Sequence, residues 1–304
     1  ELTIMIADKI NRARDGHFKD ISFNKNEMNE LRIAAWLHDV GKVAIPEYVM
    51  DKSTKLTTVN DRIELLKTRF EIIKRDIEID VLKKKLAQGT YADTDTPRVN
   101  QSRKIKNLEE DYAFLVSVNR AVEYMSDESV ERIKKIAKKK WMIDGRKQAL
   151  LSDDEIENLI IRKGTLTDNE RTVMNNHAAI TYRMLSQMPF PKKLKNVPDY
   201  ASSHHEFLNG EGYPQGLKGD EISLQARILA LADVFEALTA SDRPYREGNT
   251  LSQALKILGF MVKDNQLDHD IYNLFVNEKI YIDYARRELF ASQIDETEVR
   301  EALK

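Results

Sequence analysis

Apolar residues recur at helical spacing along most of the chain, with polar residues between them. At the start, this pattern predicts helices over 2–12 and 27–38, and Gly41 is placed to end the second in a left-handed conformation. No segment alternates in the manner of a strand, so we expect an all-α fold. The later helices are predicted from a capping box at Thr167–Glu170 onward, and then over 199–208, 222–240, 251–262 and 270–289.

The character of the pattern changes between residues 56 and 162. Apolar residues there follow a 3-4-3-4 spacing over about three heptads, which is typical of a coiled-coil seam. Two further helices are predicted, over 108–122 and 130–141, and the second ends in a lysine run typical of a solvated face. The seam consists of Leu56, Val59, Ile63, Leu66, Phe70, Ile73 and Ile77.

This change divides the chain into two parts. We expect one helical domain formed by 1–55 and 163–304, with residues 56–162 as an inserted helical subdomain, a hairpin or coiled coil. The seam has three interpretations. It closes an antiparallel hairpin within the subdomain, it forms a homodimer interface, or it acts as a lever from a sensory domain upstream of Glu1.

Composition excludes several classes of function. The chain of 304 residues is 41% hydrophobic and 32% charged, which is typical of a globular protein able to bury a core. Its formal net charge of −2 gives no overall basic field for a nucleic acid polymer or an anionic membrane. It contains no cysteine, which excludes disulfides, thiolate metal ligands and a cysteine nucleophile. We find no signal peptide and no membrane segment, and expect a cytoplasmic location.

Imidazoles and carboxylates gather at inward-facing positions of the predicted helices. A buried ionised carboxylate needs a cation or several donors, and Asp233 lies within a strongly apolar helix. Asp233 alone and His177 alone are each more often satisfied core residues than ligands. The adjacent pair His204 and His205 is harder to explain in this way, and His38-Asp39 has the same form. Together they suit Fe, Mn or another divalent transition metal, and six ligands exceed the usual complement of one ion. The set is His38, Asp39, His177, His204, His205 and Asp233.

The order of these residues resembles the HD-GYP family, phosphodiesterases of the HD superfamily that open cyclic dinucleotides, chiefly cyclic di-GMP. The resemblance covers residues 1–55 and about 163–290, and it implies an HD-superfamily helical bundle with an HD-GYP C-terminal extension. It rests on His38-Asp39 with Gly41-Lys42, on His177, on His204-His205-Glu206, on Gly212-Tyr213-Pro214, and on Asp233 with Arg243-Pro244-Tyr245.

The resemblance also implies roles. The six residues of the set would bind two or three divalent ions, Fe or Mn, with Asp39 as the bridging ligand. Lys42 would lie beside the scissile phosphate, and Arg243 and Arg246 would hold substrate phosphate. Tyr213 either stacks on a guanine or packs the glycine-rich loop over 210–219.

One ligand of the family pattern has no counterpart in this sequence. The family places a further histidine at the start of the first helix, and that position falls upstream of Glu1. His17, in the following loop, is a poor substitute.

The activity implied is hydrolysis of cyclic di-GMP by a metal-bridging hydroxide, giving pGpG, which the same site can cut again to GMP. Hydrolysis of the mixed cyclic GMP-AMP is an alternative. A nucleotide triphosphohydrolase fits His38, Asp39 and Asp233 but leaves the His204–Tyr213 segment unexplained. The chain could instead be a non-catalytic module that binds a cyclic dinucleotide or a signalling partner.

Overall fold

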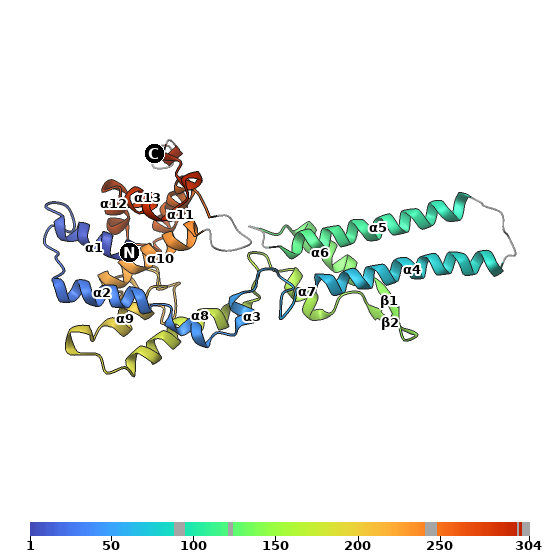
Figure 1. Cartoon of the computed structure of the whole chain (residues 1–304), viewed down its shortest axis with the longest axis horizontal. Helices are drawn as coiled ribbons and strands as arrows, with labels where there is room; N and C mark the ends of the chain where they lie inside the picture. The colour runs from blue at the N-terminus through green and yellow to red at the C-terminus, as the bar shows by residue number, and fades with distance from the viewer. Residues whose placement is uncertain (88–94, 121–123, 241–247, 297, 300–304) are drawn as a thin grey trace. The chain divides into compact units, whose positions relative to one another are not determined.

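The computed structural model describes residues 1–87, 95–120, 124–240, 248–296 and 298–299 (Figure 1). Within these ranges the regular structure is helical apart from one two-stranded sheet, so the expected all-α class is confirmed. The chain divides into two compact units. Unit 1 comprises Glu1–Ile45 and Val173–Lys304, and unit 2 comprises Pro46–Thr172. These divisions lie ten residues from the sequence-based ones at 55 and 163, and the roles of the two parts stay predictions.

Unit 1 is built around α10 (Leu224–Thr239), a strongly apolar helix. The helix begins at Ser223, whose hydroxyl accepts a hydrogen bond from the backbone N–H of Ala226. Leu231 and Phe235 are fully buried, because α10 is covered by helices on several sides. Its neighbours are α1 (Leu2–Arg12), α9 (Val197–Ser202), α11 (Leu251–Lys263) and α12 (His269–Asn277).

Two further helices of unit 1 carry site residues. Helix α2 (Lys25–Leu37) begins at a capping box formed by Asn24 and Glu27 and packs on α9. Helix α8 (Asp168–Ser186) begins in unit 2 and continues into unit 1. The capping box predicted for it is confirmed, because Thr167 and Glu170 exchange side-chain to backbone hydrogen bonds.

Two helix predictions in unit 1 need correction. The segment predicted as one helix over 270–289 forms α12 and α13 (Ile280–Glu288), because Lys279 takes a left-handed conformation with φ of 53°. The helix predicted over 199–208 ends at Ser202. His204 and His205 therefore follow a helix end. Short 3-10 turns complete the unit: η2 (Lys192–Leu194), η3 (Gly219–Glu221) and η4 (Ala291–Gln293).

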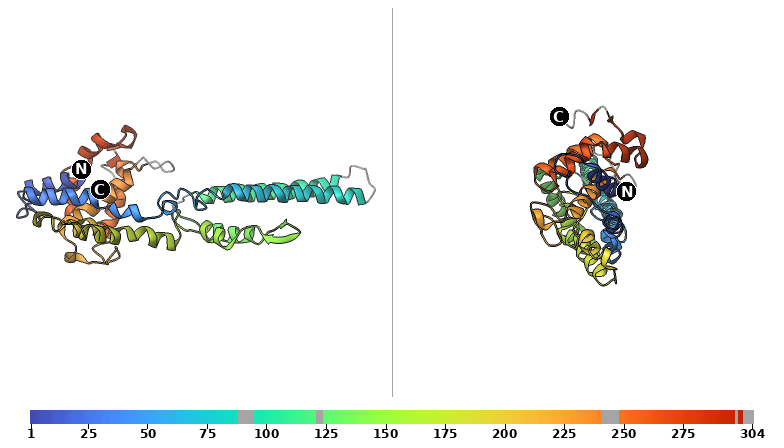
Figure 2. Two further views of the ribbon diagram at one scale, coloured as in Figure 1. Left: turned by 60° about the horizontal axis from the view of Figure 1, so that its bottom comes forward. Right: turned by 90° about the vertical axis from the view of Figure 1, so that its left-hand side faces the viewer.

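In unit 2, α4 (Ile63–Ala87) and α5 (Asp95–Asn119) run antiparallel and side by side (Figures 1 and 2). Leu66 and Phe70 are buried in a core that includes residues of α5, so the seam closes a hairpin within the chain. The prediction was wrong for Val59, which precedes α4 and is 91% exposed. The remaining helices are α3 (Glu47–Met50), α6 (Asp127–Ala137) and α7 (Asp153–Leu159).

Unit 2 also contains the one sheet of the described residues. The helix predicted over 130–141 ends at Ala137, and the chain then forms β1 (Lys140–Ile143) and β2 (Arg146–Ala149). Asp144 and Gly145, the two residues between the strands, have φ of 49° and 73°. Asp-Gly is a strong signal for a two-residue hairpin turn with positive φ at both positions, and this signal was missed.

None of the helices in the described ranges is both long enough and apolar enough to cross a membrane.

Candidate metal centre

The structure brings together all six residues predicted as metal ligands, from four separate segments of unit 1. His38 and Asp39 lie between α2 and η1 (Val40–Ala44), and His177 lies on α8. His204 and His205 follow α9. Asp233 lies on α10 and completes the cluster.

The two carboxylate oxygens of Asp39 face different imidazoles. Its Oδ2 lies 3.3 Å from Nε2 of His38. Its Oδ1 lies 3.4 Å from Nε2 of His177 and 3.9 Å from Nε2 of His204. Asp233 lies opposite, with Oδ1 3.4 Å from the same Nε2 of His38. Asp39 therefore stands between two groups of candidate ligand atoms.

These groups share His204. One consists of His177, His204 and His205, and the other of His38, Asp39 and His204; within each, the candidate ligand atoms lie within 4.8 Å of one another. One carboxylate with an oxygen toward each group is the arrangement expected of a bridging ligand between two ions.

Backbone hydrogen bonds fix the orientation of three of the imidazole rings. Each ring has its Nδ1 at hydrogen-bond distance from the carbonyl oxygen of the residue three positions earlier. The distances are 2.7 Å for His38, 2.7 Å for His177 and 2.6 Å for His204. A neutral ring that donates through Nδ1 presents an unprotonated Nε2, the form that binds a metal. His38 reaches this form when a bound ion displaces the proton that its Nε2 shares with Asp39 and Asp233.

Three polar atoms of the cluster are buried without a hydrogen-bond partner: Asp39 Oδ1, His177 Nε2 and His204 Nε2. Leaving such atoms unpaired costs about 1–3 kcal/mol each, and more for a charged oxygen. All three are acceptors that face one another, so a donor cannot come from within the set. A cation bound between them satisfies all three, and the residues therefore fit a metal site.

The surroundings of these groups set their protonation. Burial acts to lower the pKa of His38, but hydrogen bonds with Asp233 and Asp39 raise it to about 10. Burial lowers the pKa of His204 to about 3 and that of His205 to about 4. Burial acts to raise the pKa of Asp39, but the bond from His38 holds it far below its usual range. At neutral pH, His204, His205 and Asp39 therefore have the protonation that metal ligands need.

A close contact between η1 and α8 holds His38 beside His177. The backbone N–H of Gly41 donates to Oγ1 of Thr181 at 3.0 Å, and the same hydroxyl donates to the carbonyl oxygen of His38. A Cβ on Gly41 would lie 2.1 Å from the carbonyl oxygen of His177. The expected left-handed conformation of Gly41 was wrong, because its φ is not positive. This position needs glycine for close approach instead.

Glu206 was not assigned a role from the sequence, although it directly follows the two histidines. Its side chain is buried, and its two oxygens accept hydrogen bonds from the backbone N–H groups of Gln215 and Leu217 at 2.7 and 2.9 Å. It therefore holds the glycine-rich loop against the cluster. Thr181 was also missed, and a threonine on a helix face carries no signal for such a role.

The same loop carries Tyr213. Its ring centroid lies 4.8 Å from that of His205, and its backbone N–H donates to the carbonyl oxygen of His205. Burial raises the pKa of Tyr213 above its usual range, which keeps the phenol protonated. Gly212 permits this packing, because a Cβ there would lie 2.5 Å from the same carbonyl oxygen.

The remaining candidates have three different outcomes. Lys42 joins the cluster, with Nζ 2.5 Å from Oδ2 of Asp39. Arg243 and Arg246 lie outside the described residues. His17 does not join the cluster; its Nδ1 lies 3.4 Å from Asp270, and 61% of its side chain is exposed.

Comparison with known proteins agrees with this geometry. Residues 150–271 match the family model of the HD domain. The chain is 37% identical over 120 residues to 3'3'-cGAMP-specific phosphodiesterase 1 of Vibrio cholerae, covering 40% of this chain and 27% of that protein. It is 41% identical over 102 residues to the cyclic di-GMP phosphodiesterase response regulator RpfG of Xanthomonas campestris, covering 34% and 26%.

A third similar protein is a cyclic di-GMP phosphodiesterase of Thermotoga maritima, 37% identical over 100 residues, which are 33% of this chain and 27% of that protein. The chain thus spans about a quarter of the length of the curated relatives it matches.

Proposed function

Because the chain belongs to the HD-GYP family of HD-domain phosphodiesterases, we propose that it hydrolyses cyclic di-GMP to the linear dinucleotide pGpG with divalent metal ions. The observation that carries this proposal is the convergence of four imidazoles and two carboxylates. Three acceptor atoms of this cluster are buried without a hydrogen-bond partner. Divalent ions bound there neutralise phosphate oxygens and lower the pKa of a water, which are the two requirements of phosphodiester hydrolysis.

Each residue of the cluster has a defined task in this proposal. Asp39 faces both groups of ligands, which supports a bridging role. His177 and His204 are oriented by the carbonyl oxygens of Met174 and Ala201 and offer Nε2 without rearrangement. His38, His205 and Asp233 complete the set. Two ions, Fe or Mn, suit these nitrogen and oxygen donors, and six ligands leave room for a third ion with fewer protein contacts.

Positive charge beside the cluster supports phosphate binding. Lys42 is 40% exposed in its side chain while its ammonium contacts Asp39, so it can reach a phosphate oxygen at the same edge. We propose that it stabilises charge developing on that phosphate. Arg243 and Arg246 are proposed to hold the substrate phosphate on the basis of the family pattern alone.

Hydrolysis of cyclic GMP-AMP is the second candidate. It is favoured by the similarity to 3'3'-cGAMP-specific phosphodiesterases 1 and 3 of Vibrio cholerae, the latter 42% identical over 118 residues. The two substrates contain the same phosphodiester and differ in one base. Parallel assays with both, under identical metal loading, separate the candidates.

The test is metal analysis and hydrolysis with the purified chain, loaded with Fe(II) without oxygen or with Mn(II). We expect two or more ions per chain, and pGpG from cyclic di-GMP by chromatography. Asp39→Ala and His204→Ala should each lower the rate by about a hundredfold or more and reduce the bound metal. His269→Ala is the matched control, because His269 is exposed and lies outside the cluster.

Two results would contradict the proposal. One is a metal-loaded chain that leaves both dinucleotides intact. If that chain still binds them, it is a non-catalytic module. The other is unchanged hydrolysis by Asp39→Ala.

A further inference from the structure

Helix α2 exposes an aromatic and a cationic side chain, one turn apart, beside the metal cluster. Trp36 is 76% exposed, although α2 buries Leu31 and Ala34 on its other face. Trp36 and Arg32 line the same pocket as His38 and Asp233. Within the described residues both side chains are exposed, so this face of α2 presents an aromatic ring and a cation beside the cluster.

Within the described part of the chain, Arg32 forms no ion pair or hydrogen bond. The acidic residues of its pocket have partners of their own. Glu1 accepts from Arg287 at 2.9 Å, and Glu236 accepts from the hydroxyl of Tyr284 at 3.1 Å. The N–H groups of the Arg32 guanidinium are therefore available to bind a ligand.

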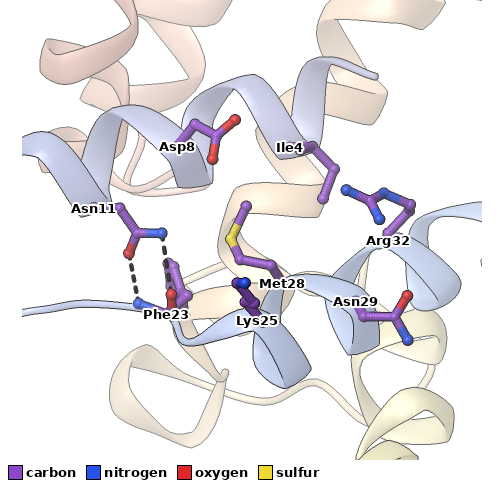
Figure 3. A pocket seen from close by; sticks show the side chains of 8 residues that line it. All are labelled: Ile4, Asp8, Asn11, Phe23, Lys25, Met28, Asn29 and Arg32. Atoms are coloured by element: carbon purple, nitrogen blue, oxygen red, sulfur yellow. Dashed lines mark hydrogen bonds between the residues drawn. The ribbon is translucent and has the colours of Figure 1, made fainter.

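Arg32 also lines a second pocket, between α1 and α2, that shares Ile4 with the first (Figure 3). Figure 3 shows Arg32 extending from α2 toward Ile4 of α1. The guanidinium thus stands at the junction of two open pockets, one of which reaches the cluster.

The spacing of these residues along α2 suits a nucleotide. Trp36 is two residues from His38, and Arg32 is one helical turn further away, about 9 Å along the axis from His38. A phosphate at the cluster is separated from its base by one ribose. Trp36 and Arg32 share a face of α2, whereas Trp36 and His38, two positions apart, do not. The pocket that all three residues line therefore provides the connection between a phosphate at the cluster and this face.

The chemistry of Trp36 and Arg32 favours a purine base, and it favours guanine over adenine. An exposed indole offers a flat face on which any base stacks. A guanidinium donates two parallel hydrogen bonds to O6 and N7 of guanine, whereas the amino group of adenine is a donor at the equivalent edge.

We propose that Trp36 and Arg32 form a guanine subsite for the dinucleotide, in which the base stacks on Trp36 and is read by Arg32. The inference rests on the proposed function for its substrate class. It predicts preference for cyclic di-GMP over cyclic di-AMP, and it places the guanine of cyclic GMP-AMP at this subsite.

A binding test does not depend on turnover. The chain has two tryptophans, Trp36 in unit 1 and Trp141 in unit 2, so Trp141→Phe leaves Trp36 as the single indole reporter. Titration with GMP should quench its fluorescence, and AMP should require about a tenfold higher concentration or more. Arg32→Ala in this background should remove the difference between GMP and AMP. Arg183→Ala, an exposed arginine on α8, is the control.

A kinetic test uses base recognition itself as the readout. Arg32→Ala and Trp36→Ala should lower kcat/KM for cyclic di-GMP about tenfold or more relative to bis(p-nitrophenyl) phosphate, which has no base. Trp36→Phe should restore part of the loss. Arg32→Lys should not, because an ammonium cannot make the paired contact.

Equal losses on both substrates, or GMP and AMP quenching Trp36 equally, would overturn the subsite. Failure of the proposed hydrolysis can be distinguished from failure of the guanine subsite. If the chain hydrolyses no dinucleotide, the fluorescence titration still decides whether guanine binds at Trp36.

Discussion

At the scale of single residues, the site depends on groups outside the set of proposed metal ligands. Thr181 joins η1 to α8 by accepting from Gly41 and donating to the carbonyl oxygen of His38. Glu206 holds the loop that carries Tyr213 by accepting two backbone hydrogen bonds. Both residues act through the ligands beside them, and both are buried.

Gly41→Ala tests this dependence. The added Cβ would lie 2.1 Å from the carbonyl oxygen of His177, so the backbone of η1 or α8 must move. We expect destabilisation of at least 1–3 kcal/mol and weaker metal binding, because His38 and His177 can no longer hold their present separation. Urea denaturation and calorimetric metal titration measure the two effects.

The matched control is Gly259→Ala on α11, where the nearest atom to an added Cβ is the hydroxyl of Tyr272 at 3.3 Å. Alanine in that helix should be neutral or slightly stabilising. Wild-type stability and metal affinity in Gly41→Ala would show that the close contact is not required.

Sequence reasoning identified the ligands but not their supports, and the reason is physical. His38, Asp39, His204 and His205 stand out because adjacent ligand-type residues at helix ends are conspicuous within a few positions. The role of Thr181 depends on a contact with Gly41, 140 residues earlier, which no local pattern encodes. The carbonyl bonds that orient the imidazoles depend on exact helix ends, and these were misplaced for His204.

At the scale of elements, periodicity was reliable within helices and weak at their boundaries. The 3-4 spacing correctly identified Leu66 and Phe70 as core positions of α4. It was extended too far toward the N-terminus, to Val59, because spacing alone does not show where a helix begins. The β1–β2 hairpin was missed because its positions are mostly exposed, so no apolar alternation marked it.

Phe70→Ala tests the packing of α4 on α5. Phe70 is 1% exposed, so its truncation should lower the free energy of unfolding of unit 2 by about 3–5 kcal/mol. The fluorescence of Trp141, on β1 in unit 2, reports this transition in a Trp36→Phe background.

Leu82→Ala on the same helix is the control, because Leu82 is 65% exposed and should change the stability little. If both variants were equally destabilised, α4 would have to bury Leu82 as well, for example against a second copy of the chain. Light scattering on the wild type would then show a dimer.

At the scale of the whole molecule, the two units have separate cores. The core around α10 contains residues of unit 1 alone, and the core around α4 and α5 contains residues of unit 2 alone. All six proposed metal ligands belong to unit 1. Metal binding should therefore stabilise one unit and not the other.

Metal removal should separate the two unfolding transitions. At a free metal concentration of 100 times Kd, binding stabilises the unit that contains the site by about 2.7 kcal/mol, and a chelator removes this contribution. We expect a chelator to lower the transition reported by Trp36 in Trp141→Phe, and to leave that reported by Trp141 in Trp36→Phe unchanged. Equal shifts of both transitions would show that the units unfold together.

The contact between Gly41 and Thr181 has a consequence for how this chain can diversify. Unit 1 is interrupted after Ile45 and resumes at Val173, yet the segments on either side of the interruption already touch through η1 and α8. The ends of the intervening segment are thus held near each other whatever lies between them, and the entropic cost of lengthening a connection rises only slowly with its length. Unit 2 can therefore be shortened, enlarged or exchanged between genes while the geometry of the His and Asp cluster is inherited unchanged.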